Sequence, residues 1–311
     1  MIIFTDRVHF VEKYIPDVLD WRPAALSEFD EPVQRLARLL IPGPVIYSSK
    51  IESPLSWRYL FLVEYAANSQ YDMLIRTARE YSDLPHGIVC AAGAGKKFHG
   101  FHDRSWAAFP GNLHLSAYFA PQRHIADFGP GFMALAAVSV LHTLDSFPAL
   151  KDRVMIKWVN DILLEGGKVC GVLSHTQAVS RIVTCAVIGI GLNIETAPPL
   201  EPTPYVPRAA ALREYIGDRD ACNEQMVFQR LLKALDTHYK TLAEGGYAQL
   251  LAVYRKRSLV IGKEASIRND EGDGESREII RGRVAGIGDN LELYFEGHPS
   301  PVTKGRLVLE S

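Results

Sequence analysis

The chain has 311 residues, a length typical of about two domains. Its 34 Lys and Arg residues nearly balance its 36 Asp and Glu residues, and the net charge of -2 argues against a protein that binds nucleic acid through a broad basic surface. With 47% hydrophobic and 23% charged residues, the composition is that of a soluble folded protein, and a chain of this length forms a full core without disulfides or metal staples.

The cysteines and the apolar runs indicate the compartment. Cys90, Cys170, Cys185 and Cys222 show no CxxC spacing, so we expect reduced thiols, no structural metal site and a cytoplasmic location. No apolar run approaches the roughly 18 residues that a membrane span needs. The N-terminal residues lack a basic region followed by an apolar stretch, so we expect neither a signal peptide nor association with a membrane.

Residues 1–55 have the weakest pattern in the chain. Only residues 33–40 show helical spacing, and the prolines at 42 and 44 end it. No helix-turn-helix is predicted. We treat residues 1–55 as an N-terminal extension that could cover a sheet edge, lengthen the main domain or recognise a partner.

Stronger signals begin at residue 58. Residues 58–63 and 87–92 read as strands, residues 112–119 alternate as a half-buried strand does, and residues 129–144 form the strongest buried-helix pattern. Residues 69–81 read as an amphipathic helix, with Ser69 or Asn68 as its N-cap and Met73, Ile75 and Ala78 near its apolar side.

The second half of the chain is rich in strands. Short strands are predicted at residues 154–158, 162–165, 169–174 and 181–190, with a hairpin turn at Gly166–Gly167, followed by a long helix at residues 223–242. Residues 258–311 read as a small β-barrel with turns at Asp273–Gly274 and Asp289–Asn290. Runs of strands with helices packed on one side predict an α+β class, with a main domain over residues 56–255 and a small domain over residues 256–311.

Three segments carry residues suited to chemistry. In the first, Gly93 and Gly95 would let backbone N–H groups approach an anion, and Lys96 and Lys97 add positive charge. The Walker spacing is absent and no regular βαβ unit follows, so neither a P-loop nor a Rossmann site is predicted. On its own the segment is equally typical of a structural turn.

The second segment is Lys157-Trp158-Val159-Asn160-Asp161 at the end of a strand. The lysine supplies charge for developing negative oxygens, and the aspartate can take Mg²⁺ directly or through water. An ordinary surface turn at Asn160–Asp161 is the alternative.

The third segment places Gly189, Gly191 and Asn193 along an apolar strand. Glycines that alternate in a strand mark close approach by a ligand or by another backbone, and a β-bulge is the alternative at equal odds.

The order and spacing of these segments resemble the catalytic domain of biotin protein ligases. The Gly/Lys segment is followed by FPGNLHLS, KWVND, GGKVCGVLSH and VIGIGLNI, and the resemblance covers residues 58–311. It implies a mixed-sheet ligase domain of the biotin/lipoate protein ligase type with a small SH3-like β-barrel at the C-terminus. It also implies an enzyme that uses ATP to form biotinyl-5'-AMP and transfers biotin to a lysine of a carrier domain of a biotin-dependent carboxylase.

The resemblance implies roles for individual residues. Lys157 matches the lysine that contacts the biotin carboxylate and the adenylate phosphate, and Asp161 matches a position near Mg²⁺. The resemblance also implies that the following positions bind biotin and ATP: Asn68, Ser69, Gln70, Gly93, Gly95, Lys96, Lys97, Trp106, Asn160, Asp161, Gly171, Gly189, Gly191 and Asn193.

Departures from the family pattern keep alternatives open. The family loop typically reads GRGRxGRxW, whereas Ala94 and Lys96 stand here in place of arginines, and Ala67 begins the segment that usually reads Ser-Thr-Asn. His102-Asp103 before Gly111-Asn112 is similar to lipoate and octanoate ligases, whose acceptor is a lipoyl domain. A cofactor-free acyltransferase and a non-catalytic binder are further alternatives, and a homodimer is possible.

Overall fold

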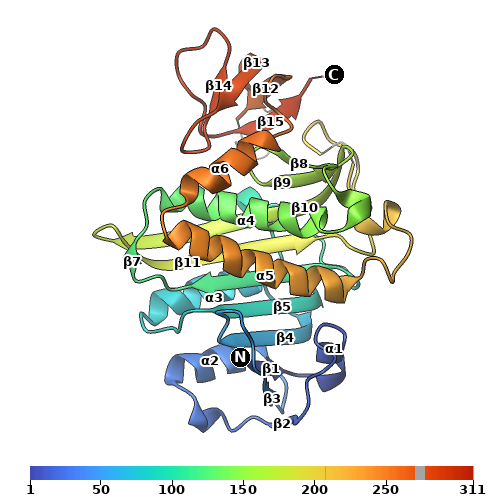
Figure 1. The fold of residues 1–311 in the computed structure, drawn as a ribbon, viewed down its shortest axis with the longest axis vertical. Helices are drawn as coiled ribbons and strands as arrows, with labels where there is room; N and C mark the ends of the chain where they lie inside the picture. Colours follow the sequence, from blue (N-terminus) through green and yellow to red (C-terminus); the bar gives the residue numbers. More distant parts are fainter. Residues whose placement is uncertain (207, 270–276, 311) are drawn as a thin grey trace.

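The computed structural model describes residues 1–206, 208–269 and 277–310. Within them, eleven strands form one mixed sheet in the order β2-β3-β1-β4-β5-β6-β11-β10-β9-β8, with β7 paired to β11 (Figure 1). The strands are β1 Ile2–Thr5, β2 Arg22–Pro23, β3 Tyr47–Lys50, β4 Tyr59–Ala66, β5 Ile88–Gly95, β6 Leu113–Phe119, β7 Arg123–His124, β8 Val154–Lys157, β9 Asp161–Leu164, β10 Gly167–Val179 and β11 Ile182–Leu192. β1, β4 and β5 run parallel, and the other pairs are antiparallel.

The first fifty residues continue the main sheet. β1 pairs in parallel with β4 and antiparallel with β3, and the two-residue strand β2 lies at the outer edge. The helices here are α1 Val8–Glu12, the 3-10 turn η1 Leu26–Glu28 and α2 Glu31–Leu40, which confirms the helix predicted at residues 33–40. Residues 1–50 therefore lengthen the main sheet, which is one of the three roles expected for the N-terminal extension. The domain boundaries expected at residues 55 and 255 stay a prediction.

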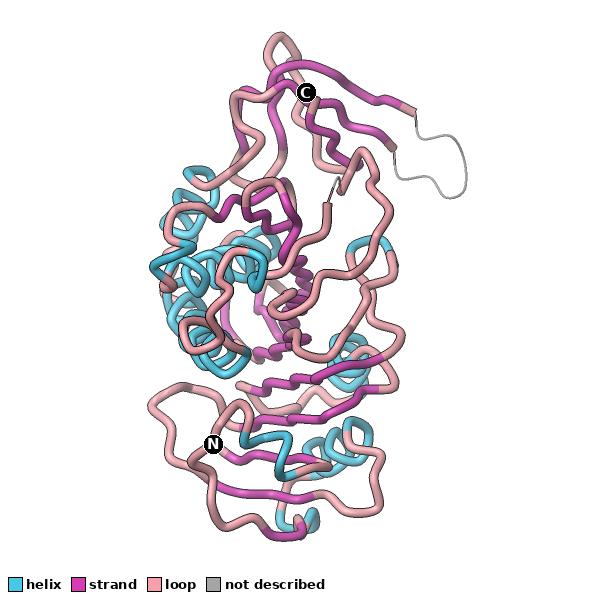
Figure 2. Tube along the Cα trace, turned by 90° about the vertical axis from the view of Figure 1, so that its right-hand side faces the viewer, coloured by secondary structure: helices cyan, strands magenta, loops and turns pink. Residues whose placement is uncertain are grey.

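The sheet separates two hydrophobic cores because side chains of a strand alternate between its faces. In β4, Leu60 and Leu62 face one core, whereas Phe61 and Val63 face the other. Helices α4 Phe128–Asp145, α5 Glu224–Ala243 and α6 Tyr247–Lys256 lie on the first face, and α2 and α3 Gln70–Glu80 lie on the second (Figures 1 and 2). α4 is long and apolar enough to cross a membrane, but 72% of it is buried inside the protein, as expected for the core helix that was predicted.

Helix α3 begins as predicted, but its buried face differs from the prediction. The Ser69 side chain accepts a hydrogen bond of 3.3 Å from the Asp72 N–H and so caps the helix. Its fully buried residues are Gln70, Leu74 and Thr77, whereas Met73, Ile75 and Ala78 are only partly buried. The helix is rotated relative to the prediction because it packs on β6 and β11 and also beside α2.

Two sequence predictions about the strands were wrong. β6 is buried along its whole length rather than half-buried, because both faces of the sheet are covered at this point. The turn between β9 and β10 is Glu165–Gly166, not Gly166–Gly167: these two residues have φ of 47° and 82°, and Gly167 already pairs with Leu164. Positive φ at both central residues is the geometry of a type I′ hairpin.

A second sheet lies at the C-terminal end. Its strands follow the order β14-β13-β12-β15, with β12 Glu264–Arg268, β13 Glu278–Ile287, β14 Leu293–Phe295 and β15 Arg306–Leu309. The predicted turn at Asp289–Asn290 is present, and the one at Asp273–Gly274 lies outside the described residues. The Trp158 indole donates a 2.6 Å hydrogen bond to the Leu291 carbonyl and joins the two units. The α+β class is confirmed, and the small sheet is consistent with an SH3-like domain.

Candidate functional site

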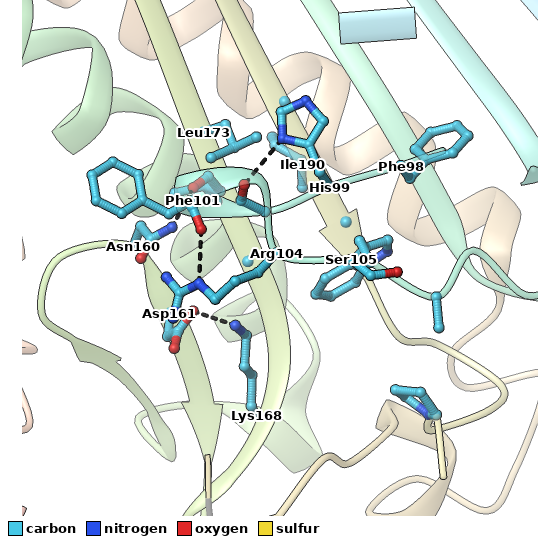
Figure 3. Close-up of a pocket in the computed structure, with 18 of the residues that line it drawn as sticks. Phe98, His99, Phe101, Arg104, Ser105, Asn160, Asp161, Lys168, Leu173 and Ile190 are labelled. Carbon is cyan, nitrogen blue, oxygen red and sulfur yellow. Dashed lines mark hydrogen bonds and ion pairs between the residues drawn. The ribbon is translucent and has the colours of Figure 1, made fainter. Parts of the chain in front are cut away.

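A cavity of about 350 Å³ lies on the face of the sheet opposite α4. Its floor is formed by Gly171 and Leu173 of β10 and Gly189 and Gly191 of β11. These residues face away from α4 because their neighbours in both strands point into the core beneath it. Residues 98–106, which follow β5, form the roof (Figure 3).

The floor glycines let two aromatic rings lie against the strands. A Cβ added at Gly191 would lie 2.6 Å from Cζ2 of Trp106, and one at Gly189 would lie 3.0 Å from the Tyr71 ring. A Cβ at Gly171 would meet the Trp106 ring at 3.4 Å. Two aromatic rings therefore approach the strand backbones more closely than side chains on the floor would permit.

Trp106 is held by a buried histidine. Its Nε1–H donates a 3.3 Å hydrogen bond to Nδ1 of His114, whose Nε2 lies 3.3 Å from the Phe109 carbonyl. Burial lowers the pKa of His114 to about 4, so the ring is neutral and can accept at Nδ1. His114 therefore fixes the indole as one wall of the cavity.

One end of the cavity is charged. The Lys168 ammonium lies 2.5 Å from the Asp161 carboxylate and 5.8 Å from the centre of the Trp106 ring (Figure 3). Arg104 also lines the cavity, and its Nε–H donates a 2.7 Å hydrogen bond to the Phe101 carbonyl in the roof. The register Asp161↔Gly171↔Gly191 places this charged end at one limit of the glycine floor.

The other end offers hydroxyl groups. Ser116 of β6 pairs with Gly189, and Ser69 and Tyr71 at the start of α3 line the same part of the cavity. Burial raises the pKa of Tyr71, so its phenol stays protonated. The cavity can thus receive an elongated molecule with a hydrogen-bonding head and an anionic tail.

A second cavity of about 390 Å³ adjoins the first. Asn160, Asp161, Arg104 and Arg306 line both cavities, and Arg306 comes from the C-terminal unit. Lys157 lines the second cavity only; it is 4% exposed, and its ammonium donates a hydrogen bond to the Tyr205 carbonyl.

The charge of Lys157 is sensitive to pH. Burial lowers its pKa to about 8; Asp161 opposes this shift, and Lys168, Arg306 and Arg104 add to it. Four cationic side chains and one carboxylate therefore face the region shared by the two cavities.

Most of the residues predicted to form the site come together. Ser69, Trp106, Asn160, Asp161, Gly171, Gly189, Gly191 and Asn193 line the first cavity, and Lys157 lines the second. The two asparagines also bind main chain: Asn160 donates to the Val172 carbonyl at 2.9 Å and Asn193 to the Ala210 carbonyl at 3.0 Å. Their assignment to ligand binding stays a prediction.

The Gly/Lys segment lies elsewhere. Gly93 and Gly95 belong to strand β5 and not to a loop, which corrects the sequence expectation. A Cβ at Gly93 would lie 2.7 Å from the Phe10 ring, so this glycine permits close packing. Lys96 and Lys97 are exposed just beyond the strand, and neither lines the two cavities.

Of the three residues predicted to bind the ligand at the start of α3, only one lines a cavity. Ser69 lines the first cavity, whereas Asn68 and Gln70 line neither. Gln70 is 1% exposed, and its amide has no hydrogen-bond partner among the described residues. Asn68 is half-buried.

Several residues of the site were missed in the sequence. Arg104 stands two positions before Trp106, which is the R-x-W ending of the family loop, and Lys168 lies within GGKVCGVLSH; both signals were present. His114 likewise lies within FPGNLHLS. Tyr71, His99 and Arg306 have no local motif and reach the cavity only through the fold.

Part of the chain is similar to proteins of one known family. Residues 66–193 match the biotin/lipoate A/B protein ligase family. The bifunctional ligase/repressor BirA of Bacillus subtilis is 26% identical over 224 residues, which are 71% of this chain and 66% of that protein. The biotin--[acetyl-CoA-carboxylase] ligase of Mycobacterium tuberculosis is 28% identical over 228 residues, 72% of this chain and 80% of that protein.

A solved structure has the same fold. The biotin protein ligase of Aquifex aeolicus, in complex with biotin and ATP, superposes with a TM-score of 0.61 at 20% identity. The superposition covers 82% of this chain and 99% of that one. The chain spans about two thirds of the length of the Bacillus relative. The predicted resemblance to the biotin/lipoate protein ligase superfamily is confirmed over the matched residues 66–193.

Proposed function

Because residues 66–193 match the biotin/lipoate A/B protein ligase family, we propose that the chain is an ATP-dependent biotin protein ligase. A biotin carboxylate oxygen attacks the α-phosphorus of ATP, giving biotinyl-5'-AMP and pyrophosphate. The amine of a carrier lysine then attacks the acyl carbon, an amide bond forms and AMP leaves. The acceptor is a carrier domain of a biotin-dependent carboxylase.

The observation that carries this proposal is the polarity of the glycine-floored cavity. The end opposite Asp161 and Lys168 offers the Ser69 and Ser116 hydroxyls, which suit a ring with hydrogen-bonding groups such as the ureido ring of biotin. Its charged end suits a carboxylate that becomes an acyl phosphate. A dithiolane ring has no comparable hydrogen-bonding groups, so the cavity favours biotin over lipoate or octanoate.

The cations of the shared region account for both chemical steps. Lys168 and Arg104 lie where the tail of the acid ends, and Lys157 and Arg306 lie in the adjoining cavity, where the phosphates of ATP would lie. Cations placed beside oxygens that gain negative charge stabilise the transition state. We therefore propose that Lys168, together with Lys157, stabilises the negative charge that develops on the reacting oxygens.

Mg²⁺ fits the site through Asp161. This carboxylate lines both cavities, and Mg²⁺ usually binds one or two carboxylates together with phosphate oxygens and waters. The ion would neutralise phosphate charge. Asp161 also holds Lys168 in place, so its removal affects two charges at once.

Exchange of labelled pyrophosphate into ATP tests the proposal. Exchange that requires biotin supports it, and exchange that requires lipoate or octanoate replaces it with the second family activity. No exchange with any of these acids indicates an acyltransferase or a binding protein. Transfer of labelled biotin to a carrier domain tests the second step. The cytoplasmic location and the homodimer remain part of the proposal.

A further inference from the structure

Residues 98–106 form a small hairpin that closes the first cavity. His99 pairs with Ser105, the Gly100 N–H donates a 2.7 Å hydrogen bond to the Arg104 carbonyl, and the Trp106 N–H donates one of 2.9 Å to the Phe98 carbonyl. Both Arg104 and Trp106 line the cavity. We call this segment the roof hairpin.

A histidine joins the roof hairpin to helix α3. Nε2 of His99 lies 2.9 Å and 3.0 Å from the two carboxylate oxygens of Asp72. Nδ1 of His99 lies 3.0 Å from the Gly100 carbonyl, the contact drawn as a dashed line at His99 in Figure 3. A carboxylate and a carbonyl accept hydrogen bonds and cannot donate them. Both ring nitrogens must therefore donate, which only the imidazolium form can do.

We propose that His99 is a positioning residue: as an imidazolium bound to Asp72, it holds the roof hairpin closed and so sets Arg104 and Trp106 over the cavity. Two arginines of the family loop are replaced here by Ala94 and Lys96, and Lys96 does not reach the cavity. Arg104 is then the arginine of the roof that lines the cavity, and its place depends on the hairpin being closed.

The charged groups around His99 favour the imidazolium. Asp72 and Tyr71 face it from α3, the latter with ring centroids 6.2 Å apart, and Asp103 faces it from its own hairpin at 3.6 Å. Burial disfavours the charged form, but the hydrogen bonds to Asp72 and Gly100 outweigh burial and raise the pKa of His99. Closure is thus complete below the ordinary histidine value of about 6.5 and is lost as the pH rises through the raised value of the closed state.

Proteolysis tests the closure without requiring any activity. Phe101 lies in the roof hairpin and is 38% exposed, so an aromatic-specific protease can cut there once the hairpin opens. We expect His99→Gln to be cut about fivefold faster than the wild type at pH 6, a factor typical of a partly exposed ion pair, and at an equal rate at pH 9. The ratio of the two rates cancels the pH dependence of the protease itself.

Three further variants sharpen the test. Asp72→Asn removes the same ion pair from the other side and should match His99→Gln at pH 6. His99→Lys keeps a cation that does not titrate in this range, so it should be cut more slowly than the wild type at pH 9. His9→Gln is the matched control, because His9 lies 3.0 Å from Glu12 in an exposed pair away from the cavity, and its ratio should be one at both pH values.

A kinetic measurement connects closure to catalysis and rests on the proposed function. The KM for biotin in pyrophosphate exchange should rise with pH in the wild type and stay constant in His99→Lys, with kcat less affected. An equal His99→Gln to wild-type cleavage ratio at pH 6 and pH 9 overturns the role of His99. Absence of exchange overturns the proposed ligase activity, and the cleavage ratios still decide on the closure.

Discussion

Trp106 lies directly on Gly191, so closely that a Cβ at this glycine would fall 2.6 Å from Cζ2 of the indole. No room for a side chain remains between the backbone of Gly191 and the indole, so a larger residue at position 191 would have to displace Trp106. Substitutions on the floor should affect ligand binding before they affect the fold.

Gly191→Ala should raise the KM for biotin about tenfold, the factor produced by about 1.4 kcal/mol of overpacking at a ligand site. Biotin-dependent pyrophosphate exchange measures this effect. Gly286→Ala is the control, since a Cβ at Gly286 meets nothing within 4 Å. Equal KM values in the two variants would remove Gly191 from the binding site.

Lys168→Ala and Lys157→Ala should each lower the rate of adenylate formation by about a hundredfold, which is typical of losing one group that stabilises transition-state charge. Single-turnover formation of biotinyl-5'-AMP measures this rate. The exposed Lys151→Ala serves as the control. An unchanged rate in Lys157→Ala would transfer the assigned role to Lys168 alone.

The adenylation rate should fall as the pH rises through about 8, because the pKa of Lys157 is lowered to about 8 by burial and its ammonium is lost above that value. The pH profile of kcat for exchange at saturating biotin and ATP, between pH 6.5 and 9.5, measures this and leaves out the effect of His99 on the KM for biotin. Lys157→Arg keeps the charge over this range, so its profile should lack this descending limb. A limb of equal position in the variant would assign the titration to another group.

Phe4→Ala should lower the free energy of unfolding of the whole chain by about 3–5 kcal/mol, as for other large buried aromatic residues. Phe4 is fully buried and stacks on Phe61 of the main sheet with ring centroids 5.0 Å apart. Urea unfolding followed by circular dichroism measures the change, and Leu19→Ala, 73% exposed, is the control. A separate early transition confined to the N-terminal residues would show that they fold on their own.

The sequence was sufficient for those parts of the molecule that depend on local pattern. Helices α3 and α5 carry their caps Ser69 and Asn223 in the sequence, and the family segments KWVND and VIGIGLNI identified the floor and the charged end of the cavity. The rotation of α3 could not be read locally, because it is set by packing against β6 and α2.

The predicted phosphate loop shows a second limit. Gly93 looked like a loop glycine, yet the parallel pairing of β5 with β4 extends the strand to Gly95, and Phe10 from the N-terminal segment packs against it. That contact joins residues more than eighty positions apart. For the same reason the His99–Asp72 pair, 27 positions apart, has no local signal.

Both edges of the main sheet are closed to further strands. At one edge β2 has only two residues, and the second is Pro23, which has no N–H to donate. At the other, the outer side of β8 is already bonded: the Ile156 N–H donates to the Arg257 carbonyl, and the Leu259 N–H donates to the Ile156 carbonyl, both at 2.8 Å. The sheet is thus protected against edge-to-edge aggregation, and two copies of the chain would associate through faces, helices or loops and not by joining their sheets into one.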